Sequence, residues 1–192
     1  MRIVCLGDSL TSGMSQGDNQ FPYGQQLQKL LDKECGKGKH EVITCGNNGE
    51  TAVSMAKRHA VETEINERKR LPPKLFILLA GTNDLRAYPA IDEETIVDAL
   101  ASMVAAADVA VVCTVPRMPT SEQRTPALTE RRDKLNTLIC ERFSPRVVDT
   151  TPIEDALFDA DGLHLTKAGY AALAKLVYPV CRAAMKRKKK PG

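Results

Sequence analysis

The chain has 192 residues, 43% of them hydrophobic, which is enough for one globular domain with its own core. No apolar stretch approaches the roughly 20 residues of a membrane-spanning helix, and the start of the chain lacks the apolar run of a secretory signal, so we expect neither. Five of the 27 basic residues are consecutive near the end. The rest of the chain has 22 Lys and Arg against 24 Asp and Glu, and we expect no nucleic-acid partner.

Short apolar or β-branched runs alternate with longer helical patterns along the chain. In chain order we predict a strand at Arg2–Leu6, a helix at Pro22–Cys35, a strand at Glu41–Cys45, a helix at Ala52–Arg70, a strand at Lys74–Ala80, a helix at Asp92–Ala106, a strand at Val109–Thr114, a helix at Pro126–Phe143, a strand at Arg146–Asp149 and a helix at Lys167–Met185.

Three of these helices have predicted start signals. Asp92 and Thr166 are suited to cap the helices that follow them, and Thr125 precedes a proline that fits a first helical position.

Strict alternation of strand and helix predicts a parallel sheet with helices on both faces. The run Leu75–Leu79 is apolar throughout, as expected for a strand buried on both sides. Such sheets carry their functional sites beyond the carboxyl ends of the strands. We treat residues 1–185 as a single domain and residues 186–192 as a basic, disordered tail.

The six cysteines are scattered and form no Cys-x-x-Cys pair. Cys5, Cys45 and Cys113 fall within predicted strands, which is typical of small buried hydrophobes in a reducing compartment. We therefore expect free thiols and a cytoplasmic location.

Residues that acyl transfer requires follow four of the predicted strands. Ser9 is a candidate nucleophile, His164 its candidate base, and Asp161, three residues upstream, a candidate orienter of the imidazole. The backbone N–H groups of Ser9 and Gly49 and the side-chain amide of Asn83 are candidate donors to an oxyanion.

Some assignments have rivals. Gly46 competes with Gly49, and Asp159 competes with Asp161. Arg86 and Arg117 follow the third and fourth strands and are placed to face a pocket, although arginines in such loops are more often solvated. No His, Cys and Asp cluster has the spacing of metal ligands, so we expect no metal and no cofactor.

Four sequence blocks occur in a fixed order: Gly-Asp-Ser-Leu at residues 7–10, a glycine loop at 46–51, Gly-Thr-Asn-Asp at 81–84 and Asp-Gly-Leu-His at 161–164. In this order they resemble the blocks of the SGNH (GDSL) hydrolases, from residue 3 to about residue 178. The resemblance implies a flavodoxin-like three-layer α/β/α sandwich with a five-stranded parallel sheet of order 2-1-3-4-5. It also implies that Ser9, Asp161 and His164 form a catalytic triad, with Ser9, Gly49 and Asn83 in the oxyanion hole.

The activity implied is hydrolysis of carboxylic esters through an acyl-enzyme. We expect a small-molecule ester with a short acyl group, because no inserted lid or cap segment is evident between the blocks. A lysophospholipase, a thioesterase, an acyltransferase and a non-catalytic binding module on the same fold remain alternatives, and the sequence leaves the oligomeric state open.

Overall fold

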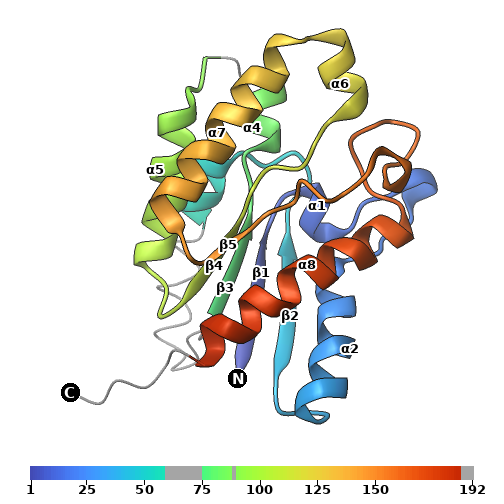
Figure 1. The fold of residues 1–192 in the computed structure, drawn as a ribbon, viewed down its shortest axis with the longest axis vertical. Coiled ribbons are helices and arrows are strands. Elements are labelled where there is room, and N and C mark those ends of the chain that lie inside the picture. Colours follow the sequence, from blue (N-terminus) through green and yellow to red (C-terminus); the bar gives the residue numbers. More distant parts are fainter. Residues whose placement is uncertain (59–74, 88–89, 187–192) are drawn as a thin grey trace.

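The computed structural model describes residues 1–58, 75–87 and 90–186 of the chain. Within them, five parallel strands form one sheet in the order β2-β1-β3-β4-β5 (Figure 1). The predicted α/β fold class and strand order are thus confirmed. The strands are β1 (Arg2–Gly7), β2 (Glu41–Gly46), β3 (Leu75–Leu79), β4 (Ala110–Cys113) and β5 (Val147–Val148).

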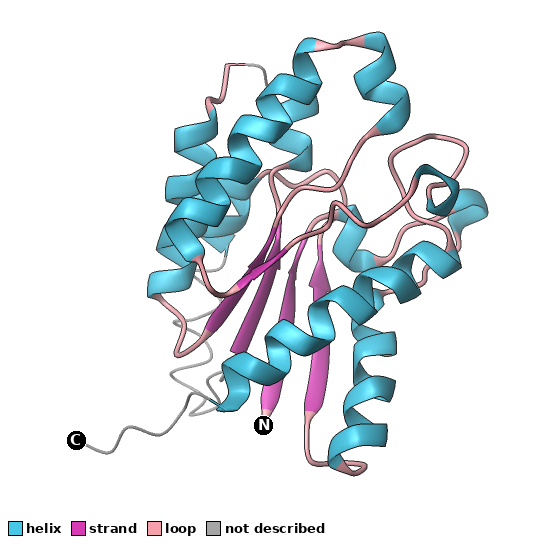
Figure 2. Cartoon of the chain, in the orientation of Figure 1, coloured by secondary structure: helices cyan, strands magenta, loops and turns pink. Residues whose placement is uncertain are grey.

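Helices cover both faces of the sheet (Figure 2). On one face α2 packs against α8, and on the other α5 packs against α7. Residues 52–58 are also helical. The labelled α-helices are α1 (Ser9–Ser12), α2 (Tyr23–Cys35), α4 (Thr82–Ala87), α5 (Glu93–Ala105), α6 (Pro119–Arg124), α7 (Ala127–Phe143) and α8 (Lys167–Lys186).

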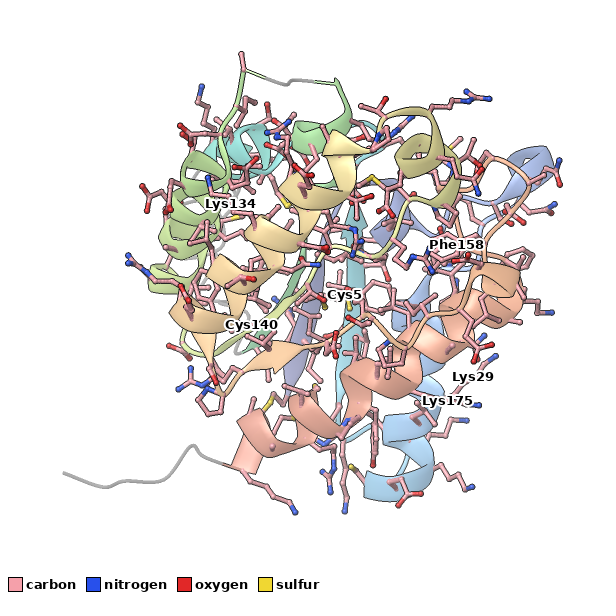
Figure 3. The ribbon with its side chains drawn as sticks, turned by 45° about the horizontal axis from the view of Figure 1, so that its top comes forward. Cys5, Lys29, Lys134, Cys140, Phe158 and Lys175 are labelled. Atoms are coloured by element: carbon pink, nitrogen blue, oxygen red, sulfur yellow. The ribbon has the colours of Figure 1, made fainter. Side chains whose placement is uncertain are left out.

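The interior strand β1 contributes to both cores because successive side chains of a strand point to opposite faces. Ile3 and Cys5 lie in the core beneath α2 and α8, whereas Val4 and Leu6 lie in the core beneath α5 and α7. Figure 3 shows Cys5 in the interior of the molecule. Every residue from Ile3 to Gly7 is buried, so β1 is held firmly and its carboxyl end is a rigid base for the residues after it.

Two of the three predicted helix caps are confirmed. The Asp92 side chain accepts from the N–H of Thr95 at 2.7 Å, and the Thr166 hydroxyl accepts from the N–H of Gly169 at 3.1 Å. The prediction for Thr125 is wrong, since α7 begins at Ala127 and no side-chain bond caps it. Thr125 instead ends α6, where its N–H donates to the carbonyl of Ser121.

Several predicted boundaries differ from the structure. The carboxyl part of the predicted helix Ala52–Arg70 and the residue Lys74 lie outside the described residues. Strand β5 has only two residues instead of four, and it pairs with β4 alone. Lys186, which we assigned to the tail, is the last residue of α8.

Three short helices occupy segments that we predicted as loops: α1, α4 and α6. Each follows a strand closely and is at most six residues long, which is too short for a periodic apolar pattern. No helix in the described part of the chain is long and apolar enough to cross a bilayer.

Candidate active site

Ser9 is the first residue of α1, directly beyond the carboxyl end of β1. The preceding Asp8 caps this helix, and its Oδ1 accepts from the N–H of Leu10 at 2.9 Å. Because Ser9 begins the helix, its own N–H has no intrahelical acceptor and can serve a ligand. Ser9 is 7% exposed, so most of the residue is buried.

The structure brings Ser9 and His164 together across 155 residues of sequence. The Nε2 atom of His164 lies 3.0 Å from Oγ of Ser9, and Nδ1 lies 2.6 Å from Oδ2 of Asp161. An ionised carboxylate can only accept, so Nδ1 carries a proton and Nε2 of the neutral ring accepts from the serine hydroxyl. The three side chains form a continuous series of contacts from hydroxyl through imidazole to carboxylate, which is the arrangement that an activated serine needs.

The Asp161 side chain is held in place by backbone N–H groups two and three residues further along the chain. Its Oδ1 accepts from the N–H groups of Leu163 and His164, both at 2.9 Å. Burial opposes ionisation, but hydrogen bonds from the His164 ring and from these two amides lower the pKa of Asp161 below its usual value. The carboxylate is therefore charged over the physiological range and ready to hold the imidazole.

The segment that carries His164 closes on itself. The N–H of Asp159 donates to the carbonyl of His164 at 2.8 Å, and the N–H of Gly162 donates to the carbonyl of Asp159 at 2.8 Å. Gly162 has φ of +61°, and a Cβ on it would overlap the side chain of Thr120 in α6. A glycine is required here by both the backbone and the neighbouring helix.

Asp159, the rival orienter, has a different role. Its Oδ2 accepts from the hydroxyl of Ser15 at 2.7 Å and from the N–H of Gln16 at 2.9 Å. It therefore fastens the segment after α1 to the His164 segment, and of the two carboxylates Asp161 is the one that contacts the imidazole.

Asn83 is buried at the start of α4 and links two other segments to the site. Its Nδ2 donates to the carbonyl of Glu50 at 3.0 Å and to Oδ2 of Asp8 at 3.3 Å. Since Asp8 adjoins Ser9 and Glu50 adjoins Gly49, the glycine loop, α4 and α1 converge at one place. Sequence reasoning missed the contact between Asp8 and Asn83, because 75 residues separate them.

The two glycines of the second block have different surroundings. Gly46 is the last residue of β2, and a Cβ on it would overlap the backbone nitrogen of Ser12 in α1. Its identity is explained by packing. Gly49 lies in an exposed turn with φ of +77°, and its N–H has no hydrogen-bond partner among the described residues. Of the two, Gly49 offers the available donor.

Two further carboxyl groups lie beneath the site. Burial raises the pKa of Asp8 to about 7, and it also raises the pKa of Asp84. The oxygens of Asp84 accept from the N–H of Ala52 at 2.9 and 3.1 Å, which fixes the glycine loop to α4. Both residues organise the loops around Ser9.

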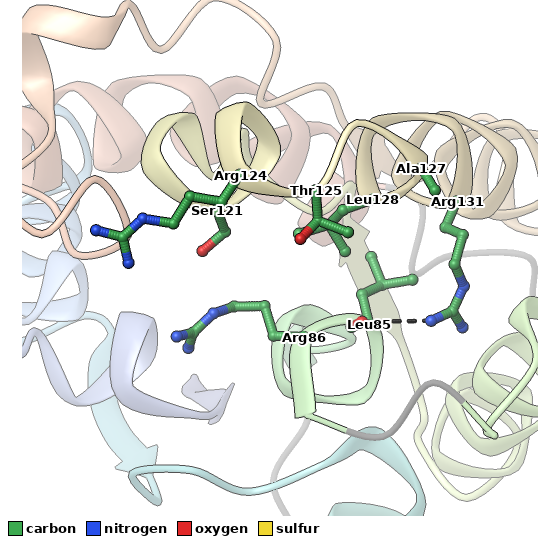
Figure 4. A pocket seen from close by; sticks show the side chains of 8 residues that line it. All are labelled: Leu85, Arg86, Ser121, Arg124, Thr125, Ala127, Leu128 and Arg131. Carbon is green, nitrogen blue, oxygen red and sulfur yellow. Dashed lines mark hydrogen bonds between the residues drawn. The ribbon is translucent and has the colours of Figure 1, made fainter.

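A cleft of about 440 Å³ lies between α4 and α6 (Figure 4). Arg86 lines this cleft, in agreement with the pocket-facing alternative that the sequence offered for it. Arg117 does not line the cleft, and its guanidinium pairs with Asp155 at 2.8 Å. Ser121 and Arg124 were missed, because α6 has no pattern that predicts a helix. The lining residues are Leu85, Arg86, Ser121, Arg124, Thr125, Ala127, Leu128 and Arg131.

Metal ligation finds no support within residues 1–58, 75–87 and 90–186. No group of three or more His, Cys, Asp or Glu side chains in these ranges is arranged to hold an ion. The polar groups that the structure gathers around Ser9 are the imidazole, carboxylate and amide groups described above.

Comparison with known proteins adds independent findings. Residues 5–172 match the model of the GDSL-like Lipase/Acylhydrolase family. The structure resembles a lipase/acylhydrolase from Enterococcus faecalis, with 22% identity, a TM-score of 0.77 and coverage of 100% of this chain and 99% of the other. It also resembles a carbohydrate acetylesterase family member from Sinorhizobium meliloti, with 18% identity, a TM-score of 0.71 and coverage of 96% of this chain and 99% of the other. The esterase EstA from Pseudoalteromonas sp. is similar as well, with 19% identity, a TM-score of 0.67 and coverage of 97% of each chain. No curated protein sequence matches the chain.

Proposed function

We propose that this chain, which belongs to the GDSL-like lipase/acylhydrolase family, hydrolyses carboxylic esters through an acyl-enzyme formed on Ser9. Family membership makes it an ester hydrolase. The observation that carries the proposed mechanism is the series of contacts from Ser9 Oγ to His164 Nε2 at 3.0 Å and from His164 Nδ1 to Asp161 Oδ2 at 2.6 Å. These are hydrogen-bond distances, so the proton path needs no rearrangement.

In the first half of the proposed reaction, Oγ of Ser9 attacks the ester carbonyl carbon while its proton passes to Nε2 of His164. The carbonyl oxygen becomes an oxyanion, and the imidazolium is stabilised by the charge of Asp161. When the tetrahedral intermediate collapses, the C–O bond to the alcohol breaks and Nε2 returns the proton to the leaving oxygen. Water then repeats the sequence on the acyl-enzyme and releases the acid and free Ser9.

The oxyanion is assigned to three donors: the N–H of Ser9, the N–H of Gly49 and Nδ2 of Asn83. The first two are supported by their position, since neither has an acceptor among the described groups. Nδ2 of Asn83 already donates twice, and its bond to Asp8 is the longer of the two at 3.3 Å. We assign the Nδ2–H that bonds to Asp8 to the oxyanion. As negative charge develops on the carbonyl oxygen of the substrate, this oxygen competes with Asp8 for the same N–H.

The substrate is proposed to be a small-molecule ester with a short acyl group. The cleft beside the site is modest, at about 440 Å³, and it is bounded by helices of the domain itself. The Sinorhizobium meliloti neighbour is described as a carbohydrate acetylesterase family member, which agrees with a short acyl group.

An activity-based probe tests the mechanism directly. EstA has been described as inhibited by monoethylphosphonate, so we expect a fluorophosphonate to label this chain at Ser9 with loss of 4-nitrophenyl acetate hydrolysis. Peptide mapping should locate the adduct, and Ser9→Ala should abolish both labelling and turnover while keeping the far-ultraviolet circular dichroism spectrum. Ser12→Ala is the matched control, because Ser12 lies in the same helix but its hydroxyl bonds to Ser9 O and Asn48 Oδ1. Labelling of Ser9→Ala, or its turnover above about a tenth of wild type, contradicts the assignment.

A further inference from the structure

Two arginines in the cleft between α4 and α6 have no partner within the described chain. Arg86 on α4 and Arg124 on α6 are exposed and make no ion pair or side-chain hydrogen bond with any described residue. Figure 4 shows both guanidinium groups at the same end of the cleft, with Ser121 close by. Two cations at one end of a cleft repel each other unless an anion lies between them.

Other arginines near this cleft are satisfied. Arg131, at its other end, bonds to Oε1 of Glu93 at 2.6 Å and to the carbonyls of Leu85 and Ile91. Arg117 pairs with Asp155 at 2.8 Å. None of the cleft's lining residues is acidic, so no carboxylate of the wall itself neutralises Arg86 and Arg124.

The rest of the lining suits an organic anion rather than a hydrated ion. Leu85, Ala127 and Leu128 give an apolar wall, while Ser121 and Thr125 contribute hydroxyl groups. Guanidinium groups bind carboxylate and phosphate oxygens with two parallel N–H donors, and hydroxyls add further donors. A short carbon chain that ends in such a group fits both parts of the cleft.

The helices α4 and α6, which line the cleft, both lead to the proposed catalytic site. Arg86 lies three residues after Asn83 on α4, within one helical turn of it. On the other side, Thr120 of α6 packs against Gly162, two residues before His164. The helix α6 is anchored in this place by Glu122, whose Oε1 accepts from the buried Arg132 at 2.7 Å and from the N–H of Met118 at 2.9 Å.

We infer that the cleft is an anion-binding subsite, separate from the oxyanion hole. The ester substrate carries a carboxylate or phosphate group, which Arg86 and Arg124 bind together. The inference rests on the proposed ester hydrolysis at Ser9 and names the class of its substrate. The anionic group lies away from the scissile bond, and it positions the carbonyl at Ser9 through the contacts that it makes in the cleft.

Matched esters test this preference. We compare kcat/KM for 4-acetoxybenzoate and for 4-acetoxyphenyl phosphate with kcat/KM for the neutral methyl 4-acetoxybenzoate. In both charged esters the anion lies on the alcohol side of the scissile bond. Phenyl hydrogen adipate and phenyl methyl adipate form the matched pair with the anion on the acyl side. In at least one comparison we expect the charged ester to be preferred about tenfold or more, through KM, and the preference to shrink as ionic strength rises. The comparison that shows it identifies the anion and its side.

Single variants then locate the preference. Arg86→Gln and Arg124→Gln should each reduce the charged-to-neutral ratio about fivefold or more, whereas Arg117→Gln, which removes an equal charge outside the cleft, should preserve it. Both target side chains are exposed, and equal melting temperatures confirm that the variants fold. Equal kcat/KM for charged and neutral esters in the wild type overturns the inference, as does a preference that survives both substitutions. Neutral-ester hydrolysis that Ser9→Ala abolishes would still uphold the proposed function, so the two ideas fail separately.

Discussion

At the scale of single residues, the site depends on carboxyl groups placed in contrasting surroundings. Asp161 lies at the surface with its side chain 50% exposed, and three hydrogen bonds from neighbouring N–H groups favour its charged form. Asp8 is fully buried, and burial favours its neutral form. The charged Asp161 can stabilise an imidazolium on His164 during the proposed reaction. The neutral, buried Asp8 makes the free energy of unfolding depend on pH.

Replacing Asp161 by Asn should lower kcat/KM for a neutral ester by about 10²–10⁴-fold, because the charge that stabilises the imidazolium is lost while Ser9 and the oxyanion donors remain. Asp159→Asn is the control, and since the Asp159 side chain bonds to Ser15 and Gln16 in the segment after α1, the effect of this change should stay below about tenfold. A larger effect of Asp159→Asn than of Asp161→Asn would show that the wrong carboxylate is assigned.

The buried Asp8 predicts how stability varies with pH. Its folded pKa is about 7 against an ordinary value of 3.8, so between these values the folded protein holds a proton that the unfolded chain has released. The free energy of unfolding should therefore fall as pH rises from about 4 to 7. Asp161, whose pKa is lowered, adds stability that is lost only in more acidic solution.

Urea denaturation at several pH values between 4 and 8 measures this effect. In Asp8→Asn the fall should become shallower, with the remainder from Asp84, whose pKa is raised in the same direction. The slope is the readout, because the substitution also changes the contact with Asn83 and so alters stability at every pH. An equal slope in the variant and the wild type would refute the assignment to Asp8.

At the scale of elements, the site depends on short helices that hold the strand ends together. The hydroxyl of Ser12 in α1 donates to Oδ1 of Asn48 at 2.6 Å, α4 supplies Asn83, and α6 packs against the segment that carries His164. The contact between α6 and Gly162 has little room, since a Cβ on Gly162 would lie 2.7 Å from the backbone nitrogen of Thr120.

Gly162→Ala should therefore displace the His164 segment. Alanine is disfavoured at a φ of +61° and also meets Thr120, so the variant should be destabilised by about 1–3 kcal/mol and should lose most of its kcat. Gly49→Ala provides a comparison, because its φ is also positive but the space around its Cβ is open. Thermal melting and ester turnover measure the two effects. A Gly162→Ala protein no less stable than Gly49→Ala would show that contact with α6 is unimportant.

At the scale of the whole molecule, the parallel sheet brings residues far apart in sequence to one edge. Ser9 follows the interior strand β1, Asn83 follows the central strand β3 beside it, and His164 reaches them from beyond β5. All the groups assigned to the reaction belong to the chain itself. Activity should therefore persist after prolonged EDTA treatment followed by gel filtration. Loss of turnover that zinc or magnesium restores would mean that a serine mechanism is insufficient.

The sequence by itself determined the parallel α/β fold and, through its family resemblance, the strand order, and it proposed five site residues. These depend on short-range patterns: apolar strands, glycine turns and four blocks with fixed order. Its assignments for Ser9, His164 and Asp161 agree with the observed contacts, and Gly49 and Asn83 stay proposals for the oxyanion.

Only the tertiary structure decided the remaining questions. It separated Asp161 from Asp159 and Gly49 from Gly46 by showing what each contacts. It also placed Arg124 opposite Arg86, although α6 was not predicted. The physical reason is that such contacts join segments many residues apart across the edge of the sheet, and local preferences carry no information on which polar side chains will meet there.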